Sequence, residues 1–195
     1  MNSHSDPGLN RFFFFRYGIV PTDVVTAFSG YQYLDAITPF FTSMFLHGGW
    51  LHLAGNMLYL WIFGDNIEDR LGHGRYFAFY VLCGLAAGAL HVIMDPLSGI
   101  PTVGASGAIS GVLGAYLVLF PRARVLTVIP VFVFIQLAEL PAIIVLAFWF
   151  IIQFFNGLVS FGVETGGSGG VAWWAHIGGF LAGFLLILPF RKEGP

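Results

Sequence analysis

Charged residues are scarce in this sequence, and cysteine is almost absent. Asp, Glu, Lys and Arg together make up 9% of the 195 residues, with a formal net charge of −2. Average soluble domains carry charge on about a quarter of their residues, so the composition excludes an ordinary water-soluble domain. The single cysteine, Cys83, cannot form an internal disulfide, which excludes a disulfide-stabilised fold.

Long apolar runs take the place of the missing charges. Hydrophobic residues make up 57% of the chain, and the mean hydropathy is +0.81. Five runs have about the length that crosses a hydrocarbon layer of roughly 30 Å as a helix. They are Trp50 to Gly64, Tyr76 to Met94, Ser106 to Phe120, Leu140 to Phe155 and Val171 to Phe190. The sequence therefore predicts an all-α polytopic membrane protein, a single bundle of five transmembrane helices.

Lys and Arg are missing from the connections 95–105 and 156–170. Six of the eight Lys and Arg residues occur after the first, third and fifth apolar runs, as Arg70, Arg75, Arg122, Arg124, Arg191 and Lys192, whereas Arg11 and Arg16 precede the first run and would lie on the outer side as an anomaly. Basic residues near the ends of spans favour the cytoplasmic side. We therefore expect these three ends to be cytoplasmic and the two connections without basic residues to lie on the outer side.

The segment before the first apolar run is not expected to span the membrane. It is rich in Phe and Tyr but is interrupted by residues that break helices, namely Gly18, Pro21, Gly30 and Pro39. We expect three regions: an N-terminal segment and membrane-associated outer loop in 1–49, a helical core in 50–190 and a cytoplasmic tail in 191–195.

Three polar residues fall at one depth inside the predicted helices. Ser106, His176 and Asn56 lie 16, 15 and 14 residues before a basic residue that follows the same helix. At 1.5 Å per residue, these separations are roughly 24, 22 and 21 Å. Burying such groups in hydrocarbon without partners costs several kcal/mol, so intramembrane polar residues indicate a site. The site would lie about 6 to 9 Å below the outer surface, and water would reach it from outside.

The same residues also have a purely structural interpretation. Small residues spaced four apart, such as Gly107 with Gly111 and Gly179 with Gly183, are typical of helix packing in membranes. A single buried histidine such as His176 is commonly a hydrogen-bonded core residue. The matched depth of the serine and the histidine favours a site, and small residues would let their two helices approach closely enough for contact.

The motifs around these positions resemble those of the rhomboid family of intramembrane serine proteases, from about Phe12 to the C-terminus. The family's Gly-x-Ser-Gly motif matches Gly104-Ala105-Ser106-Gly107, its Ala-His-x-x-Gly-x-x-x-Gly helix matches Ala175, His176, Gly179 and Gly183, and its His-x-x-x-Asn signature matches His52 and Asn56. The acidic and glycine pattern that closes that helix is present in Gly64, Glu68 and Gly72.

The resemblance implies a role for each matched residue. Ser106 would be the nucleophile and His176 the general base and later acid, since an imidazole with a pKa near 6.5 can activate a serine hydroxyl at neutral pH. Asn56 and His52, with the Ser106 backbone N–H, would form the oxyanion hole. The glycines Gly104, Gly107 and Gly179 would support this arrangement.

The implied function is an intramembrane serine endopeptidase that acts on transmembrane protein substrates. The alternative is a rhomboid-like pseudoprotease that binds or escorts membrane helices without cleaving them. The expected partners are these substrates and membrane lipids, with no nucleic acid and no cofactor. We also expect no metal site, because His47 and His52 lack the other features of a metal motif. We expect a multi-pass protein of a prokaryotic cell membrane, with its active site opening to the outer face.

Two features depart from the family pattern. Family cores usually have six helices, of which the first is expected to be absent from this chain. Many members have a tyrosine one turn after the nucleophile, where Ser110 stands here. No Asp or Glu occurs at the depth of His176, so we expect a dyad whose imidazole is oriented by packing and neutral hydrogen bonds instead of a carboxylate.

The aromatic residues of the last two helices suggest further roles. Trp149, Trp173 and Trp174 are expected to be interfacial anchors, with substrate contact as the alternative. The fourth helix is rich in large aromatic residues and precedes the glycine-rich segment 162–170. Bulky side chains can close the lateral side of the bundle, and glycines permit movement of the backbone. This helix and segment are therefore a candidate gate.

Overall fold

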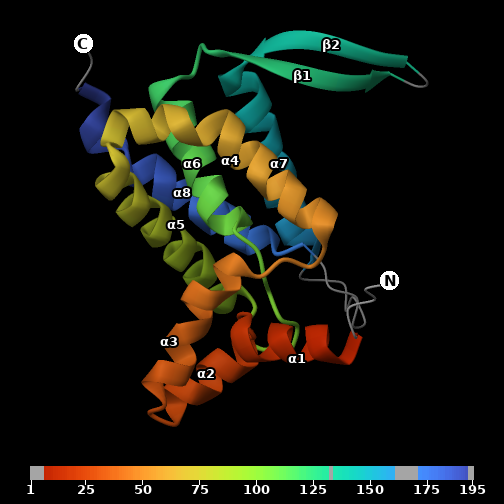
Figure 1. Ribbon diagram of the computed structural model, residues 1–195, viewed down its shortest axis with the longest axis vertical. Coiled ribbons are helices and arrows are strands. Elements are labelled where there is room, and N and C mark those ends of the chain that lie inside the picture. Colours follow the sequence, from red (N-terminus) through yellow and green to blue (C-terminus); the bar gives the residue numbers. More distant parts are fainter. Residues whose placement is uncertain (1–6, 132–133, 161–170, 193–195) are drawn as a thin grey trace, which may run out of the picture.

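Five long helices form a bundle in the computed structural model, which describes residues 7–131, 134–160 and 171–192 (Figure 1). They are α4 (Trp50–Leu71), α5 (His73–Met94), α6 (Ser106–Leu119), α7 (Ala142–Ser160) and α8 (Trp173–Leu186). Each apolar run contributes one helix, so the predicted polytopic helical bundle is confirmed. The glycine-rich segment 162–170 and residues 193–195 of the expected tail lie outside the described residues.

Within the described residues, three stretches are long and apolar enough to cross a membrane. They are His73–Met94, Ala142–Ser160 and Trp173–Phe190, the last of which runs from α8 into the 3-10 helix η2 (Leu188–Lys192). Helix α6 is apolar but has only 14 residues, or about 21 Å of length. A helix this short does not by itself reach across a hydrocarbon layer of about 30 Å, and the membrane depth of Ser106, its first residue, stays a prediction.

The close approach of α6 and α8 sets the centre of the bundle. A Cβ atom on Gly179 would overlap the backbone carbonyl of Gly107, and one on Gly183 would overlap that of Gly111. Only glycine permits this separation, and residues of α6 from Gly107 to Tyr116 are all buried. The small residues therefore pack the two helices together, as their four-residue spacing predicts.

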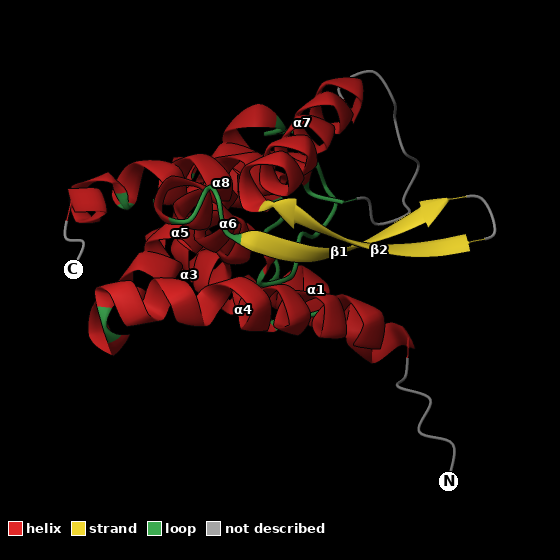
Figure 2. Ribbon diagram, turned by 90° about the horizontal axis from the view of Figure 1, so that it is seen from above, coloured by secondary structure: helices red, strands yellow, loops and turns green. Residues whose placement is uncertain are grey.

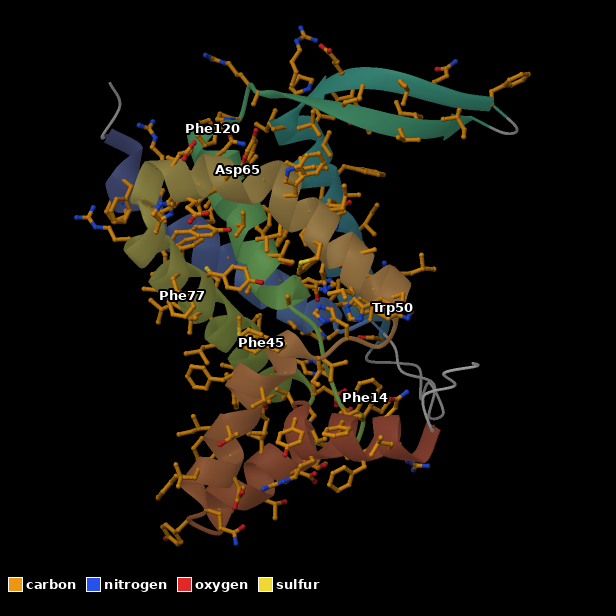
Figure 3. The ribbon with its side chains drawn as sticks, viewed as in Figure 1. Phe14, Phe45, Trp50, Asp65, Phe77 and Phe120 are labelled. Atoms are coloured by element: carbon orange, nitrogen blue, oxygen red, sulfur yellow. The ribbon has the colours of Figure 1, made fainter. Side chains whose placement is uncertain are left out.

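The two ends of the bundle carry different groups of basic residues. Helix α4 carries Trp50 at the end nearer residues 7–45 and Asp65 in the half nearer residues 124–141, as Figure 3 shows. Arg70 and Arg75 flank the junction of α4 and α5, and Arg122 follows α6 at the same end of the bundle. These basic residues gather where the sequence places them, whereas two further arginines lie in residues 7–17 at the opposite end. The assignment of the end at the junction of α4 and α5 to the cytoplasm stays a prediction.

The N-terminal segment forms three short helices at the opposite end (Figure 1). They are α1 (Pro7–Tyr17), α2 (Pro21–Ser29) and α3 (Tyr33–Thr42), followed by the 3-10 helix η1 (Ser43–Phe45). None is long enough to span a membrane, as expected, but the segment is helical where a loop was expected. One reason is Pro21, which starts α2 at a position where proline is favourable.

A β-hairpin that the sequence did not predict connects α6 to α7. Strand β1 (Arg124–Val131) pairs antiparallel with β2 (Phe134–Pro141), with Arg124 opposite Pro141. The hairpin extends beyond the edge of the bundle (Figure 2), and five of its apolar side chains are exposed: Leu126, Val128, Phe134, Ile135 and Leu137. Since both faces are apolar, the sequence lacks the alternation that marks a half-buried strand. Helix α7 consequently starts at Ala142 instead of Leu140.

Candidate functional site

Ser106 is the first residue of α6 and follows a loop with an unusual backbone. Gly104 has φ +125°, a conformation that favours glycine, and its N–H donates to the Ser43 carbonyl at 2.9 Å. A Cβ atom here would lie 2.7 Å from His52 Nε2. The loop therefore needs glycine for two reasons, its backbone angle and the adjacent imidazole, and it fixes where α6 begins.

His176 lies in the first turn of α8, and its ring faces Ser106. The two atoms His176 Nε2 and Ser106 Oγ are 2.9 Å apart, a hydrogen-bond distance. The packing of Gly179 against Gly107 brings these helices together close to both residues. Because Ser106 can donate its hydroxyl proton only to an unprotonated nitrogen, this geometry suits a neutral imidazole with its proton on Nδ1.

Gln153 of α7 contacts the other nitrogen of the imidazole, and our sequence analysis did not identify it. His176 Nδ1 donates to Gln153 Oε1 at 2.8 Å, and the glutamine is 6% exposed. The sequence analysis expected neutral hydrogen bonds to the imidazole but named no partner, and an amide oxygen is such a neutral acceptor. The available signal was a glutamine in a helix that has no Asp, Glu, Lys or Arg.

Two tryptophan rings flank the same imidazole. The Trp149 ring lies 5.9 Å from the His176 ring with 36° between their planes, and the Trp173 ring lies 6.4 Å away in an edge-on arrangement. Trp149 is thus inside the bundle, beside the histidine, and not at the end of a span as expected of an interfacial anchor. Ser110, at the position of the family's tyrosine, is buried and donates to the Ser106 carbonyl at 2.6 Å.

Helix α4 contributes two further donors to this region. Asn56 is 7% exposed, and its Nδ2 has no hydrogen-bond partner among the described residues. A buried donor without a partner costs about 1 to 3 kcal/mol, which points to a ligand that would accept from it. His52 Nδ1 accepts from the Gly48 N–H at 3.2 Å. The proton of a neutral His52 is then on Nε2, the nitrogen that faces Gly104.

His47 lies next to His52, with 5.2 Å between the ring centroids. Burial, with a smaller effect from His52, holds the pKa of His47 below its usual range. A neutral His47 places no positive charge against His52. In 7–131, 134–160 and 171–192, no three His, Cys, Asp or Glu side chains cluster as metal ligands would.

One cavity of about 1110 Å³ brings the predicted residues together. Its lining includes Ser106, His176, Asn56 and His52, together with Gly104, Gly107 and Trp149. Side chains of α1, including Arg11, and the loop 99–104 complete the wall, so the cavity lies toward the end of the bundle that carries α1, opposite the junction of α4 and α5. Gly179 is outside this lining and acts through the packing of α8 on α6.

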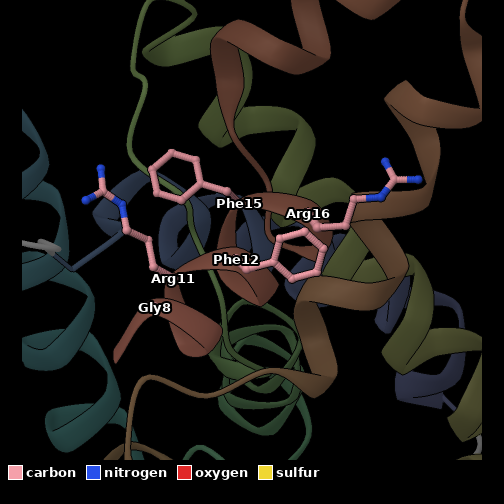
Figure 4. A pocket seen from close by; sticks show the side chains of 5 residues that line it. All are labelled: Gly8, Arg11, Phe12, Phe15 and Arg16. Carbon is pink, nitrogen blue, oxygen red and sulfur yellow. The ribbon is translucent and has the colours of Figure 1, made fainter. Parts of the chain in front are cut away.

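A second hollow lies on α1, lined by Gly8, Arg11, Phe12, Phe15 and Arg16 (Figure 4). Arg11 stacks its guanidinium over the Phe15 ring at 5.6 Å. This hollow offers neither a nucleophile nor a base. The chemistry of the molecule is therefore assigned to the larger cavity, where a hydrogen-bonded serine and histidine face two donors of α4.

Comparisons with known proteins point to one family. The family model Rhomboid domain matches residues 35–193. RHOMBOID-like protein 5 of Arabidopsis thaliana is 34% identical over 143 residues, which are 73% of this chain and 40% of that protein. Rhomboid protein 1, mitochondrial, of Saccharomyces cerevisiae is 38% identical over 88 residues, which are 43% of this chain and 25% of that protein.

Rhomboid protease GluP of Bacillus subtilis is 41% identical over 76 residues, 39% of this chain and 14% of that protein. This chain thus spans less than half the length of each of these relatives. They include mitochondrial and plant proteins, so the comparisons do not support the expected prokaryotic cell membrane. With a family model over residues 35–193 and a helical bundle of the expected kind, the chain belongs to the rhomboid family.

Proposed function

We propose that this protein is an intramembrane serine endopeptidase with Ser106 as nucleophile and His176 as general base and acid. The observation that supports this most directly is the 2.9 Å separation of His176 Nε2 and Ser106 Oγ at the wall of a cavity. A serine hydroxyl is a weak nucleophile until a hydrogen-bonded base takes its proton. The family includes serine proteases and also inactive members, so the activity is a proposal for this chain.

The proposed reaction starts when Ser106 Oγ attacks the carbonyl carbon of the scissile peptide. The hydroxyl proton passes to His176 Nε2, and a tetrahedral intermediate forms with negative charge on the former carbonyl oxygen. His176 then gives this proton to the leaving amine, and an acyl-enzyme on Ser106 remains. A water molecule, deprotonated by the same imidazole, attacks the acyl carbon. The ester bond to Ser106 then breaks, His176 returns the proton to Ser106 Oγ, and the new carboxyl end of the substrate is released.

Three N–H groups would stabilise the negative charge of the intermediate. Asn56 Nδ2 is buried without a partner among the described residues, so its hydrogens are free for a substrate oxygen. His52 Nε2 adds a second donor, and the backbone N–H of Ser106 a third, because the first N–H groups of a helix have no partner within it. Fixed donors aimed at the developing charge commonly provide the largest single contribution to catalysis.

The proposed substrates are transmembrane helices, cleaved near their outer ends. A peptide carbonyl inside a helix is hydrogen-bonded and covered, so the helix must open before Ser106 can reach it. Segments with Gly or Pro open most readily because these residues favour helix least. The cavity would receive the opened segment and water at the end of the bundle opposite the junction of α4 and α5, which we assign to the outer face.

Labelling with a serine-reactive fluorophosphonate tests the proposal directly. The probe should label the purified wild-type protein, and the Ser106→Ala and His176→Ala variants should neither take up the probe nor cleave a single-pass substrate in vesicles. Cleavage that persists in Ser106→Ala would refute the mechanism. A folded wild-type protein that takes up no probe, cleaves nothing and still binds transmembrane segments would indicate the pseudoprotease alternative.

A further inference from the structure

We propose that Gln153 is a positioning residue that holds His176 in the tautomer needed for catalysis and so makes the dyad depend on the placement of α7. The inference rests on the proposed function. It concerns a residue outside the motifs by which the sequence resembles the family, and a helix that contributes neither Ser106 nor His176.

The position of Gln153 on α7 is one where an apolar residue would be expected. The buried residues of this helix are Ala142, Leu146, Gln153 and Gly157, which form the stripe that faces the bundle. The other faces carry large exposed side chains such as Phe148 and Phe155, at 64% and 61%. A glutamine in a buried membrane stripe is costly unless its amide is hydrogen-bonded, and here its Oε1 accepts from His176.

This hydrogen bond determines which imidazole nitrogen carries the proton. A neutral histidine has one donor nitrogen and one acceptor nitrogen, and the general base needs Nε2 as the acceptor. The amide oxygen of Gln153 accepts only from a protonated Nδ1 and therefore selects the productive tautomer. In serine proteases with a triad, an aspartate performs this task, and a substitution that selects the wrong tautomer lowers kcat about 10⁴-fold. Gln153 would supply the orientation without the negative charge.

The contact also makes α7 part of the catalytic arrangement. Two of the groups around the imidazole, Gln153 and Trp149, come from α7. Ser106 of α6 and Trp173 of α8 would stay beside the ring if α7 moved away. Displacing α7 would thus remove both the acceptor and one ring contact, so His176 is held for catalysis only while α7 packs against α8.

A pair of nearly isosteric variants separates this role from simple packing. Gln153→Met keeps the length of the side chain but removes the amide acceptor, whereas Gln153→Glu keeps an acceptor at the same place. A packing role predicts that Met is tolerated and that a buried Glu is harmful. A positioning role predicts the reverse for catalysis. Asn156→Leu, which removes an amide from a half-buried position of the same helix, is the matched control.

In vesicles with a single-pass substrate, Gln153→Met should lower kcat at least about tenfold and change KM by less than about twofold. Gln153→Glu should keep kcat within about tenfold of wild type, and Asn156→Leu should match wild type. Full kcat in Gln153→Met with loss in Gln153→Glu would overturn the proposal. If Gln153→Met does not fold, Gln153→Asn provides the same test, since its amide is withdrawn by one methylene and kcat should again fall.

A second measurement does not depend on protease activity. In ¹⁵N-histidine spectra of the detergent-solubilised protein, the His176 signals are identified among the six histidines by their loss in His176→Ala. Wild type should show a protonated Nδ1, and Gln153→Met should show loss of this preference. An unchanged tautomer in Gln153→Met would refute the inference even if the protein is a protease. The predicted change in a protein without cleavage would support it while the proposed function failed.

Discussion

The proposed oxyanion role of Asn56 leads to an unusual combination of expected effects. In Asn56→Leu, a side chain of similar shape replaces a buried amide whose Nδ2 has no partner among the described residues. If Nδ2 forms its hydrogen bond only with a substrate oxygen, it contributes nothing to the stability of the substrate-free protein. The substitution should therefore harm catalysis without harming the fold.

The magnitudes follow from the geometry of the site. Losing one oxyanion donor costs about 2.7 to 4 kcal/mol, or roughly a hundred- to thousandfold in kcat. Activity should not vanish, because His52 Nε2 and the Ser106 N–H would remain to share the charge. The unpartnered amide costs the folded protein about 1 to 3 kcal/mol, so removing it should leave the thermal midpoint in detergent unchanged or higher.

The assay is the initial rate of cleavage against substrate concentration in vesicles, with thermal unfolding measured on the same preparations. The control is Met57→Leu, which introduces leucine at the next residue of α4, where the side chain is 42% exposed. It should keep full kcat. A raised KM with unchanged kcat in Asn56→Leu would show that Asn56 binds substrate, and a large loss of stability would show that the amide supports the fold.

Three further predictions concern the frame of the site. Gly104 has φ +125°, so Gly104→Ala should lower the free energy of unfolding by about 1 to 3 kcal/mol and reduce the rate of cleavage. Thermal unfolding and initial rates measure the two effects, and an unchanged thermal midpoint would contradict the prediction. Gly183→Ala should separate α6 from α8 and abolish cleavage, whereas Gly74→Ala, with open space around it, should be silent in the same assays. In a variant that lacks Cys83, Gly99→Cys should react with a membrane-impermeant thiol reagent in intact cells, and His73→Cys should not. The opposite pattern would overturn the predicted topology.

The bundle was predictable because membranes impose a simple rule on sequence. A span has to be apolar over about 20 residues, and the runs such as Tyr76 to Met94 satisfy it almost without ambiguity. The hairpin was not predictable by the same rule. Its strands are apolar on both faces, so neither a period of two nor a period of 3.6 stands out, and β2 runs directly into α7 at Ala142.

The N-terminal helices were missed for a different reason. Pro21 and Gly30 were interpreted as interruptions of a possible span, which they are, but both lie at the ends of a short helix, α2. Helix breakers exclude a continuous span and do not exclude short helices, and Pro39 even lies within α3. The backbone pairing of Ile19 with Thr102 ties this region to the loop before Ser106, and no local pattern reports a contact so distant in sequence.

Some features of the site could likewise be predicted from the sequence, and others could not. Depth can be counted along a helix, so Ser106 and His176 could be placed in one plane from the basic residues that follow each helix. Whether two side chains at equal depth face each other depends on the rotation of each helix, and here the glycine contacts of Gly179 on Gly107 fix it. Gln153 is on a helix that offers no such motif, and its rotation toward His176 follows only from the packed structure.

The two interpretations of the small residues, packing and catalysis, therefore describe one physical arrangement. A nucleophile and a base on separate helices meet at 2.9 Å only if the backbones approach more closely than larger side chains allow. In a membrane this approach is driven by van der Waals packing and interhelical hydrogen bonds, without a hydrophobic contribution between helices. The Gly179 and Gly183 contacts supply the first, and the bonds of His176 to Ser106 and Gln153 supply the second. A change that loosens the packing should consequently lower kcat before it unfolds the protein, since a small misplacement of the reacting groups is enough to slow the reaction.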